Sequence, residues 1–496
     1  MWTSNRSDIG TDQHLSDLSD PQAACRCSSA EHSRRSFLGT CRIGLGSLAL
    51  ATLLHESGSK AAGPSHTETN GGLHFAARAK RVIFLFMHGA PSHVDTFDYK
   101  PLLIRDNGKP LPFDKPRVQF AQTGNLLRSP WTFRQYGQSG RWVSDLFPEV
   151  AQHVDEMTFV HSLHGSNEAH GGALLKIHTG SDTFVRPSMG AWIGYGLGTE
   201  NQNLPSFVTI NPTLGHGGVQ NFGSAFLPAQ FQATRIGKSR TKMMEASITN
   251  LVNSHSTHQR QREELDLSQT LNRLKLEQVG IDAQLQSRVE SLELAYRMQM
   301  EAPDVVDLSR ETLDTYRLYG IDQPHTENFG RECLLARRLC EAGVRFVQVS
   351  HAYWDQHSEL KEKHSELAAE VDRPIAGLLQ DLKNRGLLDD TLVIWGAEFG
   401  RTPTAQGTNG RDHNPHAFTY WMAGGGVRRG FSYGESDDYG FYAAQNKVHM
   451  HDFHATLLHL LGIDHERLIY SYGGRDFRLT DVHGHVVHEI MEPRDI

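Results

Sequence analysis

Cysteine is scarce in this chain, which has 5 cysteines in 496 residues, and most of it lies near the N-terminus. Cys25, Cys27 and Cys41 belong to the N-terminal region, which leaves Cys333 and Cys340 in the rest of the chain. These two are seven positions apart on a predicted helix, a separation of about 10 Å along the helix axis. A disulfide cannot span that distance, so we expect no disulfide framework and assign both thiols to packing.

Long apolar runs and excess basic charge are also missing. The apolar stretch Ile43 to Leu54 is shorter than the ~20 residues that a membrane-spanning helix needs, so we expect no membrane span after signal removal. Lysine and arginine number 49 against 57 acidic residues, giving a formal net charge of −8. A protein that binds the phosphate backbone normally presents a basic surface, so we do not expect nucleic acid as a partner.

The N-terminal residues have the order of an export signal. Paired arginines occur in Ser33 to Leu38 (SRRSFL), the mildly apolar stretch follows, and small residues at Ser59 to Ala61 suit cleavage. This arrangement resembles a twin-arginine signal. We predict that residues 1–61 are the signal peptide, that 62–79 are a flexible spacer, and that the protein is exported to the periplasm or beyond the cell. The alternative is a chance arginine pair before a short helix.

Residues 80–496 are predicted to form a single α/β domain. Short apolar runs without alternation, typical of strands buried on both faces, are separated by amphipathic stretches of helical length. This order predicts a largely parallel central sheet with helices on both faces. The predicted strands are 81–87, 157–161, 205–211, 343–350 and 391–395, and the predicted helices include 168–178, 358–385 and 452–461.

A segment around 255–300 differs from the rest because leucines recur among charges at nearly helical spacing. It predicts a helical insertion, broken near Gly280, that covers the sheet or caps the site. A coiled coil that binds a partner is the alternative, although the heptad pattern is irregular.

Carboxylates and imidazoles follow three of the predicted strands. Ligands bind beyond the carboxyl ends of parallel strands, so these side chains are expected at one rim. The first strand end gives Ser92, His93, Asp95 and Asp98, the second gives His351, Asp355, His357 and Glu359, and the third gives Glu398, Arg401, Asp412, His413 and His416.

Oxygen and nitrogen donors without cysteine suit Zn, Mn, Ca or Mg, and not a thiolate site. We therefore predict a divalent metal ion at this rim, with Arg401 or Arg411 balancing the charge of an anionic substrate, and we name Arg401 for that role. For Asp95 alone, a helix N-cap is the competing interpretation. The predicted metal ligands are Asp95, Asp355, His357, Glu398 and His413.

The same region carries long motifs. They are APSHVDTFD (90–98), WDQH (354–357), EFGRTP (398–403), GRDH (410–413) and HDFHATLLHLLGID (451–464). With them the chain resembles a bacterial, twin-arginine-exported family of sulfatase-like proteins in the alkaline phosphatase and sulfatase superfamily, over nearly all of residues 80–490. The resemblance implies an alkaline-phosphatase-like fold and metal-dependent hydrolysis of sulfate or phosphate esters.

Two departures from the superfamily pattern concern the site. In the superfamily, a strand is followed by Asp-His-Gly or Asp-Asn-Gly, which supply metal ligands. At the matching place this chain has Glu398 and then Phe399, which cannot coordinate a metal. We expect His413 or His416 to substitute. Sulfatases also place a nucleophile where this chain has His170, so no covalent nucleophile of the usual kind is supplied there.

Two roles for His170 follow. It is either a metal ligand, with water attacking the substrate directly, or a helix-start histidine satisfied by backbone groups. Ser162, Ser166 and Asn167 lie close to His170 in sequence and Ser92 lies at another strand end, but none has the context expected of the nucleophile. We name Ser92, His170 and Arg401 as candidate catalytic residues.

The sequence thus predicts an exported, metal-dependent hydrolase acting on an anionic small molecule or polysaccharide ester. The alternative is a non-catalytic member of the superfamily that binds an anionic polysaccharide or a partner in the cell envelope. Loss of the nucleophile favours the second hypothesis, and the retained carboxylates and imidazoles favour the first.

Overall fold

The structure is a computed structural model that describes residues 72–114, 122–248, 251, 256–280 and 282–493. The predicted signal, 1–61, and most of the predicted spacer lie outside these residues. The last part of that spacer, 72–79, is bound to the domain, because His74 and Ala79 donate backbone hydrogen bonds of 2.9 Å to the carbonyls of Gly462 and Leu460. Ala79, the last residue of this stretch, is fully buried. Among the described helices, none is long and apolar enough to cross a membrane.

A nine-stranded sheet forms the centre of the fold, in the order β12-β4-β11-β8-β1-β7-β5-β6, with β15 pairing β4. Only β11 runs antiparallel to its neighbours in this sheet. The predicted α/β class with a largely parallel sheet is therefore confirmed. The strands are β1 (Arg81–Met87), β4 (Met157–His164), β5 (Phe207–Ile210), β6 (Thr234–Ile236), β7 (Phe346–His351), β8 (Thr391–Gly396), β11 (Phe418–Ala423), β12 (Phe431–Tyr433) and β15 (Val448–His449).

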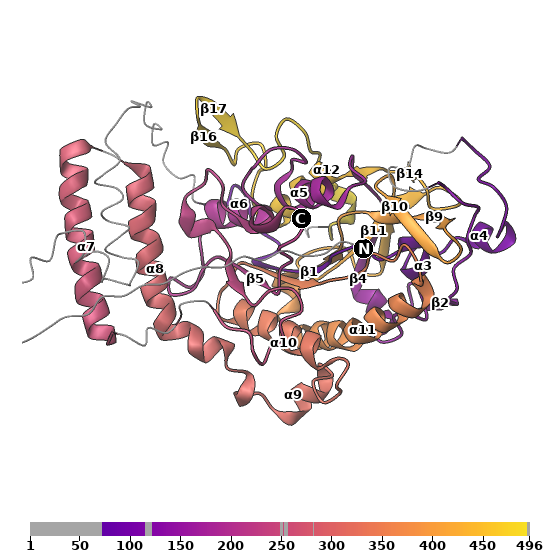
Figure 1. The fold of residues 1–496 in the computed structure, drawn as a ribbon, viewed down its shortest axis with the longest axis horizontal. Coiled ribbons are helices and arrows are strands. Elements are labelled where there is room, and N and C mark those ends of the chain that lie inside the picture. The colour runs from indigo at the N-terminus through magenta and orange to yellow at the C-terminus, as the bar shows by residue number, and fades with distance from the viewer. Residues whose placement is uncertain (1–71, 115–121, 249–250, 252–255, 281, 494–496) are drawn as a thin grey trace, which may run out of the picture. The chain divides into compact units, whose positions relative to one another are not determined.

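Helices cover both faces of the sheet, which explains the continuous apolar runs of β1 and β8 (Figure 1). One face carries α10 (Glu327–Glu341) and α11 (Leu360–Asn384). The other carries α5 (His170–Thr179), α6 (Met189–Leu197) and α12 (Met450–Leu460). Pro374 lies inside α11, which is continuous across it.

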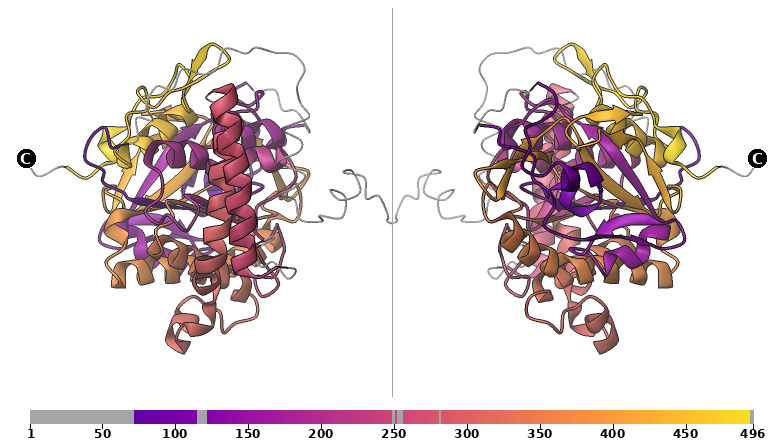
Figure 2. Two further views of the ribbon diagram at one scale, coloured as in Figure 1. Left: turned by 90° about the vertical axis from the view of Figure 1, so that its left-hand side faces the viewer. Right: turned by 90° about the vertical axis from the view of Figure 1, so that its right-hand side faces the viewer.

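Helices α7 (His258–Val279) and α8 (Ala283–Val306) lie side by side as a pair (Figure 2). Arg262 joins them through an ion pair of 2.7 Å with Glu293. Helix α8 also packs against α10 and the short helix η3 (Ala229–Phe231), so the pair stands beside the helices that cover the sheet.

The segment after β8 contains a β-hairpin. Strands β9 (Gly400–Gln406) and β10 (Gly410–Asn414) pair antiparallel, and their register sets His413 opposite Arg401. The remaining elements are α3 (His93–Thr96), α4 (Pro101–Arg105), β2 (Phe133–Tyr136), β3 (Arg141–Ser144), η1 (Val150–Glu156), η2 (Gly218–Phe222), η4 (Leu308–Arg310), α9 (Leu313–Leu318), η5 (Leu388–Asp390), β13 (Glu435–Ser436), β14 (Ala443–Gln445), β16 (Tyr470–Tyr472), β17 (Arg475–Phe477) and η6 (His488–Ile490).

Candidate metal centre

Strands β8, β1 and β7 are neighbours in the sheet, and the segments that follow them meet at one edge. The segment after β1 contributes backbone, because the Gly89 amide donates a hydrogen bond of 2.8 Å to Glu398 Oε1. Gly89 has φ +102°, and a Cβ there would lie 2.8 Å from the Trp354 nitrogen. Only glycine lets the loop after β1 approach the loop after β7 this closely.

Glu398 follows β8 and contacts the first residue of α5. Its Oε1 lies 2.8 Å from His170 Nδ1, and its side chain is fully buried. Although burial acts to raise it, the hydrogen bond from His170 and the nearby His88 lower the pKa of Glu398 to about 2. The other carboxylate oxygen, Oε2, is buried and has no hydrogen-bond partner in the part of the chain that the structure describes. Buried polar atoms are normally paired, and an oxygen of this kind can be paired by a water molecule or an ion.

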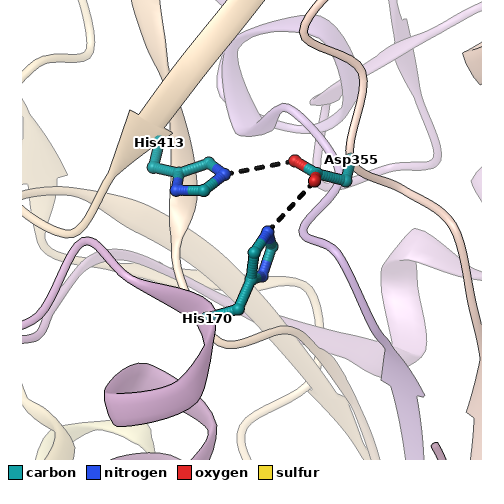
Figure 3. Close-up of side chains that lie close together, drawn as sticks. All are labelled: His170, Asp355 and His413. Carbon is teal, nitrogen blue, oxygen red and sulfur yellow. Dashed lines mark hydrogen bonds and ion pairs between the residues drawn. The ribbon is translucent and has the colours of Figure 1, made fainter. Parts of the chain in front are cut away.

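Asp355 follows β7 and is the point where most of the site residues meet. Its Oδ1 lies 2.6 Å from Arg401 Nη2, 2.9 Å from His357 Nε2 and 3.1 Å from His413 Nε2. Its Oδ2 lies 3.2 Å from His170 Nε2 (Figure 3). Asp355 is more open than its neighbours, with 38% of its side chain exposed against 10% for His170 and 5% for His413.

The charges of the cluster are strongly coupled. Burial acts to raise the pKa of Asp355, but hydrogen bonds from the three histidines and the Arg401 charge hold it far below its usual range. Burial also opposes charge on His170, yet its hydrogen bonds to the two carboxylates raise its pKa to about 9. His413 differs, because burial lowers its pKa.

Three of these residues present donors that converge. His170, Asp355 and His413 each offer one ligand atom, and the three atoms lie within 4.8 Å of one another (Figure 3). The opposite nitrogen of each imidazole is held, His170 Nδ1 by Glu398 and His413 Nδ1 by the Glu168 carbonyl at 2.6 Å. Metal-binding histidines are typically oriented in this way by carboxylate or carbonyl oxygens. The donor set fits a divalent cation that accepts nitrogen and oxygen ligands.

Arg401 does not lie where a substrate anion could reach it. Its side chain is fully buried, and it donates to the Ala90 carbonyl at 2.9 Å and the Trp354 carbonyl at 3.2 Å, as well as to Asp355. Arg401 thus contacts Asp355 inside the protein, which does not support its predicted contact with a substrate anion.

Asp95 lies in a different cluster. Both of its oxygens contact Arg411, at 2.6 and 3.1 Å, and both side chains are fully buried. Although burial acts to raise it, the Arg411 charge lowers the pKa of Asp95. The prediction that Asp95 is a metal ligand is not supported by this placement. Ser92 is also fully buried, and its backbone amide donates to His364 Nε2 at 3.1 Å, a placement that does not support its predicted role as a nucleophile.

The other predicted residues lie around the three converging donors. His357 flanks the centre, with one ring nitrogen on Asp355 and the other on Gln406. Phe399 packs on His413, with 4.5 Å between ring centroids. Of the two proposed substitutes for the missing ligand, the structure brings in His413, whereas the His416 ring packs on Tyr442.

Two further imidazoles belong to this region and were not among the predicted ligands. The His88 ring lies 6.0 Å from the His170 ring, and the His216 ring lies 5.2 Å from it. His88 directly follows the first predicted strand, so its position was a usable signal. His216 lies in a glycine-rich loop (LGHGG) after β5, and no periodic pattern points to it.

Together, the fold and the donors describe an α/β protein with a candidate metal centre at the carboxyl edge of its sheet. The chain belongs to the family described as Protein of unknown function (DUF1501), whose model matches residues 79–491. A comparison with curated proteins finds no match.

Among solved structures, the chain is similar to Ps i-CgsB in complex with k-i-k-neocarrahexaose, at 10% identity over 77% of this chain and 72% of that chain, with a TM-score of 0.36. The PsFucS1 sulfatase from Pseudoalteromonas sp. shares 13% identity over 78% of this chain and 69% of that chain, with a TM-score of 0.33. A protein in the alkaline phosphatase superfamily from Vibrio parahaemolyticus shares 10% identity over 79% and 69%, with a TM-score of 0.35. Likeness at this level is too distant to assign an activity.

Proposed function

We propose that this protein binds a divalent metal ion through His170, Asp355 and His413 and hydrolyses a sulfate or phosphate ester or a related anionic group. The observation that carries the proposal is the convergence of two imidazoles and a carboxylate within 4.8 Å. The buried, unpartnered Glu398 Oε2 next to His170 supports it. Such an ion supplies Lewis-acid activation of water and of an ester oxygen.

The chain's own residues would hold this centre in place. Glu398 fixes the ring orientation of His170, and Arg401 fixes the Asp355 carboxylate. Phe399 covers one side of His170 and His413, which limits the access of bulk water to the ligands. Because Ser92 is buried elsewhere, we infer that a water molecule attacks the substrate and that no covalent intermediate forms on a side chain.

One observation favours the alternative, a non-catalytic protein that binds an anionic polysaccharide or an envelope partner. The oxygens of Asp355 already contact Arg401, His170, His357 and His413, so protein donors balance its charge. A centre of this kind can be held together by hydrogen bonds alone.

Elemental analysis of purified mature protein separates the two candidates. We expect a stoichiometric divalent metal in the wild type and its loss in Asp355→Ala and Glu398→Ala. Glu359→Gln is the matched control, because this carboxylate follows the same strand but pairs with Lys363 at the surface. If the wild type holds no metal, the hypothesis of a metal-dependent hydrolase is wrong.

A panel of aryl sulfates, phosphomonoesters and phosphodiesters then tests turnover. Hydrolysis that disappears in Asp355→Ala supports the enzyme. A metal-containing protein that turns over none of them supports the binding protein.

We also propose export by the twin-arginine route, on the pattern of Ser33 to Leu38. Replacing Arg34 and Arg35 by lysine is expected to retain the precursor inside the cell, as measured by fractionation. Normal processing of that variant would rule the route out.

A further inference from the structure

His216 lies over the candidate metal centre. It belongs to the loop between β5 and η2, and its ring lies nearly parallel to the His170 ring, at 18° and 5.2 Å between centroids. The His88 ring is 6.0 Å away. His216 is exposed, whereas only 10% of the His170 side chain is exposed. It therefore occupies the solvent side of the ligand His170.

The backbone holds His216 in an unusual conformation. Its φ is +44°, and the next two residues, Gly217 and Gly218, have φ +95° and +55°. Residues other than glycine rarely adopt this region, and those that do cluster where ligands are bound.

A buried side chain fixes the loop. Asn221 is 3% exposed and donates a hydrogen bond of 3.1 Å to the His216 carbonyl. A Cβ at Gly217 would lie 2.7 Å from Asn221 Oδ1, so this approach requires glycine. The buried Asn221 side chain thus fixes the position of the His216 backbone.

The His216 ring stacks on His170, but its two nitrogens make no hydrogen bond with the described residues. Among the described residues, neither of its ring nitrogens takes part in a hydrogen bond or ion pair, in contrast to those of His170, His357 and His413. Nor does it join the group of donors that converge, which is His170, Asp355 and His413. An imidazole always has one N–H donor, whichever tautomer is present.

We propose that His216 is a substrate-contacting residue that donates its ring N–H to an oxygen of the sulfate or phosphate group held at the metal centre. This assignment rests on the proposed function. In this proposal, the glycine-rich loop that carries His216 contacts the anion from the solvent side.

Binding of inorganic phosphate and of inorganic sulfate to the purified metal-containing protein, measured by calorimetry, tests the proposal. For whichever of the two anions the wild type binds, His216→Ala is expected to lower the affinity about tenfold. This is the loss typical of one hydrogen bond to a charged group. His216→Gln, which keeps an N–H donor, is expected to stay within about threefold of the wild type. Metal content is expected to be the same in all three proteins.

Leu214→Ala is the matched control, because Leu214 lies in the same loop and is 45% exposed. Loss of metal in His216→Ala would make His216 a ligand and overturn the proposal. So would unchanged anion binding, or an equal loss in Leu214→Ala. If the wild type contains metal but binds neither anion, the proposed function fails as well; if only the variants contradict expectation, the assignment of His216 alone fails.

Discussion

Glu398 and His170 are joined by a hydrogen bond of 2.8 Å between Oε1 and Nδ1, which ties the end of β8 to the first residue of α5. The bond leaves His170 Nε2 facing Asp355, at 3.2 Å from Oδ2. The hydrogen bond between His413 Nδ1 and the Glu168 carbonyl does the same for the second imidazole. The orientation of both rings is therefore fixed before any ion binds.

Glu398→Gln tests that orienting bond. The amide keeps the size of the side chain but loses the charge, so metal affinity is expected to fall about 10- to 100-fold, as for other residues that orient a ligand. Affinity is measured by competition with a chelator.

Glu370→Gln is the control for that variant, because Glu370 contacts His351 at 2.9 Å away from the converging donors. Equal affinity in Glu398→Gln and the wild type would mean that the bond does not serve the metal.

Metal affinity is expected to depend on pH. In the metal-free protein, hydrogen bonds to Asp355 and Glu398 overcome burial and raise the pKa of His170 to about 9. A ligand must lose its proton to bind metal, so affinity is expected to rise as pH increases from about 6.5 to 9.

The stability of the metal-free protein is expected to change in the opposite sense. Because the pKa of His170 is raised on folding, its contribution is fully present below about 6.5 and is lost as pH rises through about 9. Chelator competition and urea unfolding at pH 6, 7.5 and 9 measure the two trends. Affinity that is flat over this range would show that His170 is not a ligand.

The Asp95–Arg411 pair is expected to matter for stability and not for metal. Removing one partner of a buried ion pair leaves a buried charge unpaired, so Asp95→Asn is expected to cost about 3–5 kcal/mol of unfolding free energy. Metal content per folded molecule is expected to remain that of the wild type.

The double variant Asp95→Asn with Arg411→Met is the control for that experiment. It removes the orphaned cation and is expected to recover part of the loss. Metal loss from folded Asp95→Asn would return Asp95 to the candidate ligands.

The sequence predicted the sheet and the edge at which the site lies, because runs such as Arg81–Met87 are apolar without alternation. It did not predict which side chains pair there. Asp95 and Asp355 both follow strands, yet one meets Arg411 and the other Arg401. That choice depends on the β9–β10 hairpin, whose register sets His413 opposite Arg401. His216 was missed because the position of its loop depends on contacts with a buried asparagine and on φ angles, which leave no periodic signal.

Glu332 on α10 predicts a pH effect on stability that is independent of the metal centre. It is 2% exposed, and burial raises its pKa to about 8 against hydrogen bonds of 2.7 and 2.8 Å from Asn211 and Asn328. Between about pH 4.5 and 8 the folded state holds a proton that the unfolded state has lost. The free energy of unfolding therefore falls as pH rises through this range, by up to ~1.4 kcal/mol per unit.

Glu332→Gln is expected to remove that part of the slope, because the amide stays neutral and still accepts both hydrogen bonds. Urea unfolding at pH 5, 6.5 and 8 compares the two proteins. The variant is expected to gain stability relative to the wild type as pH rises. Glu327→Gln, a half-buried position on the same helix whose carboxylate pairs with Arg331, is expected to follow the wild-type curve. Parallel curves for Glu332→Gln and the wild type would show that Glu332 is ionised in the folded protein across this range.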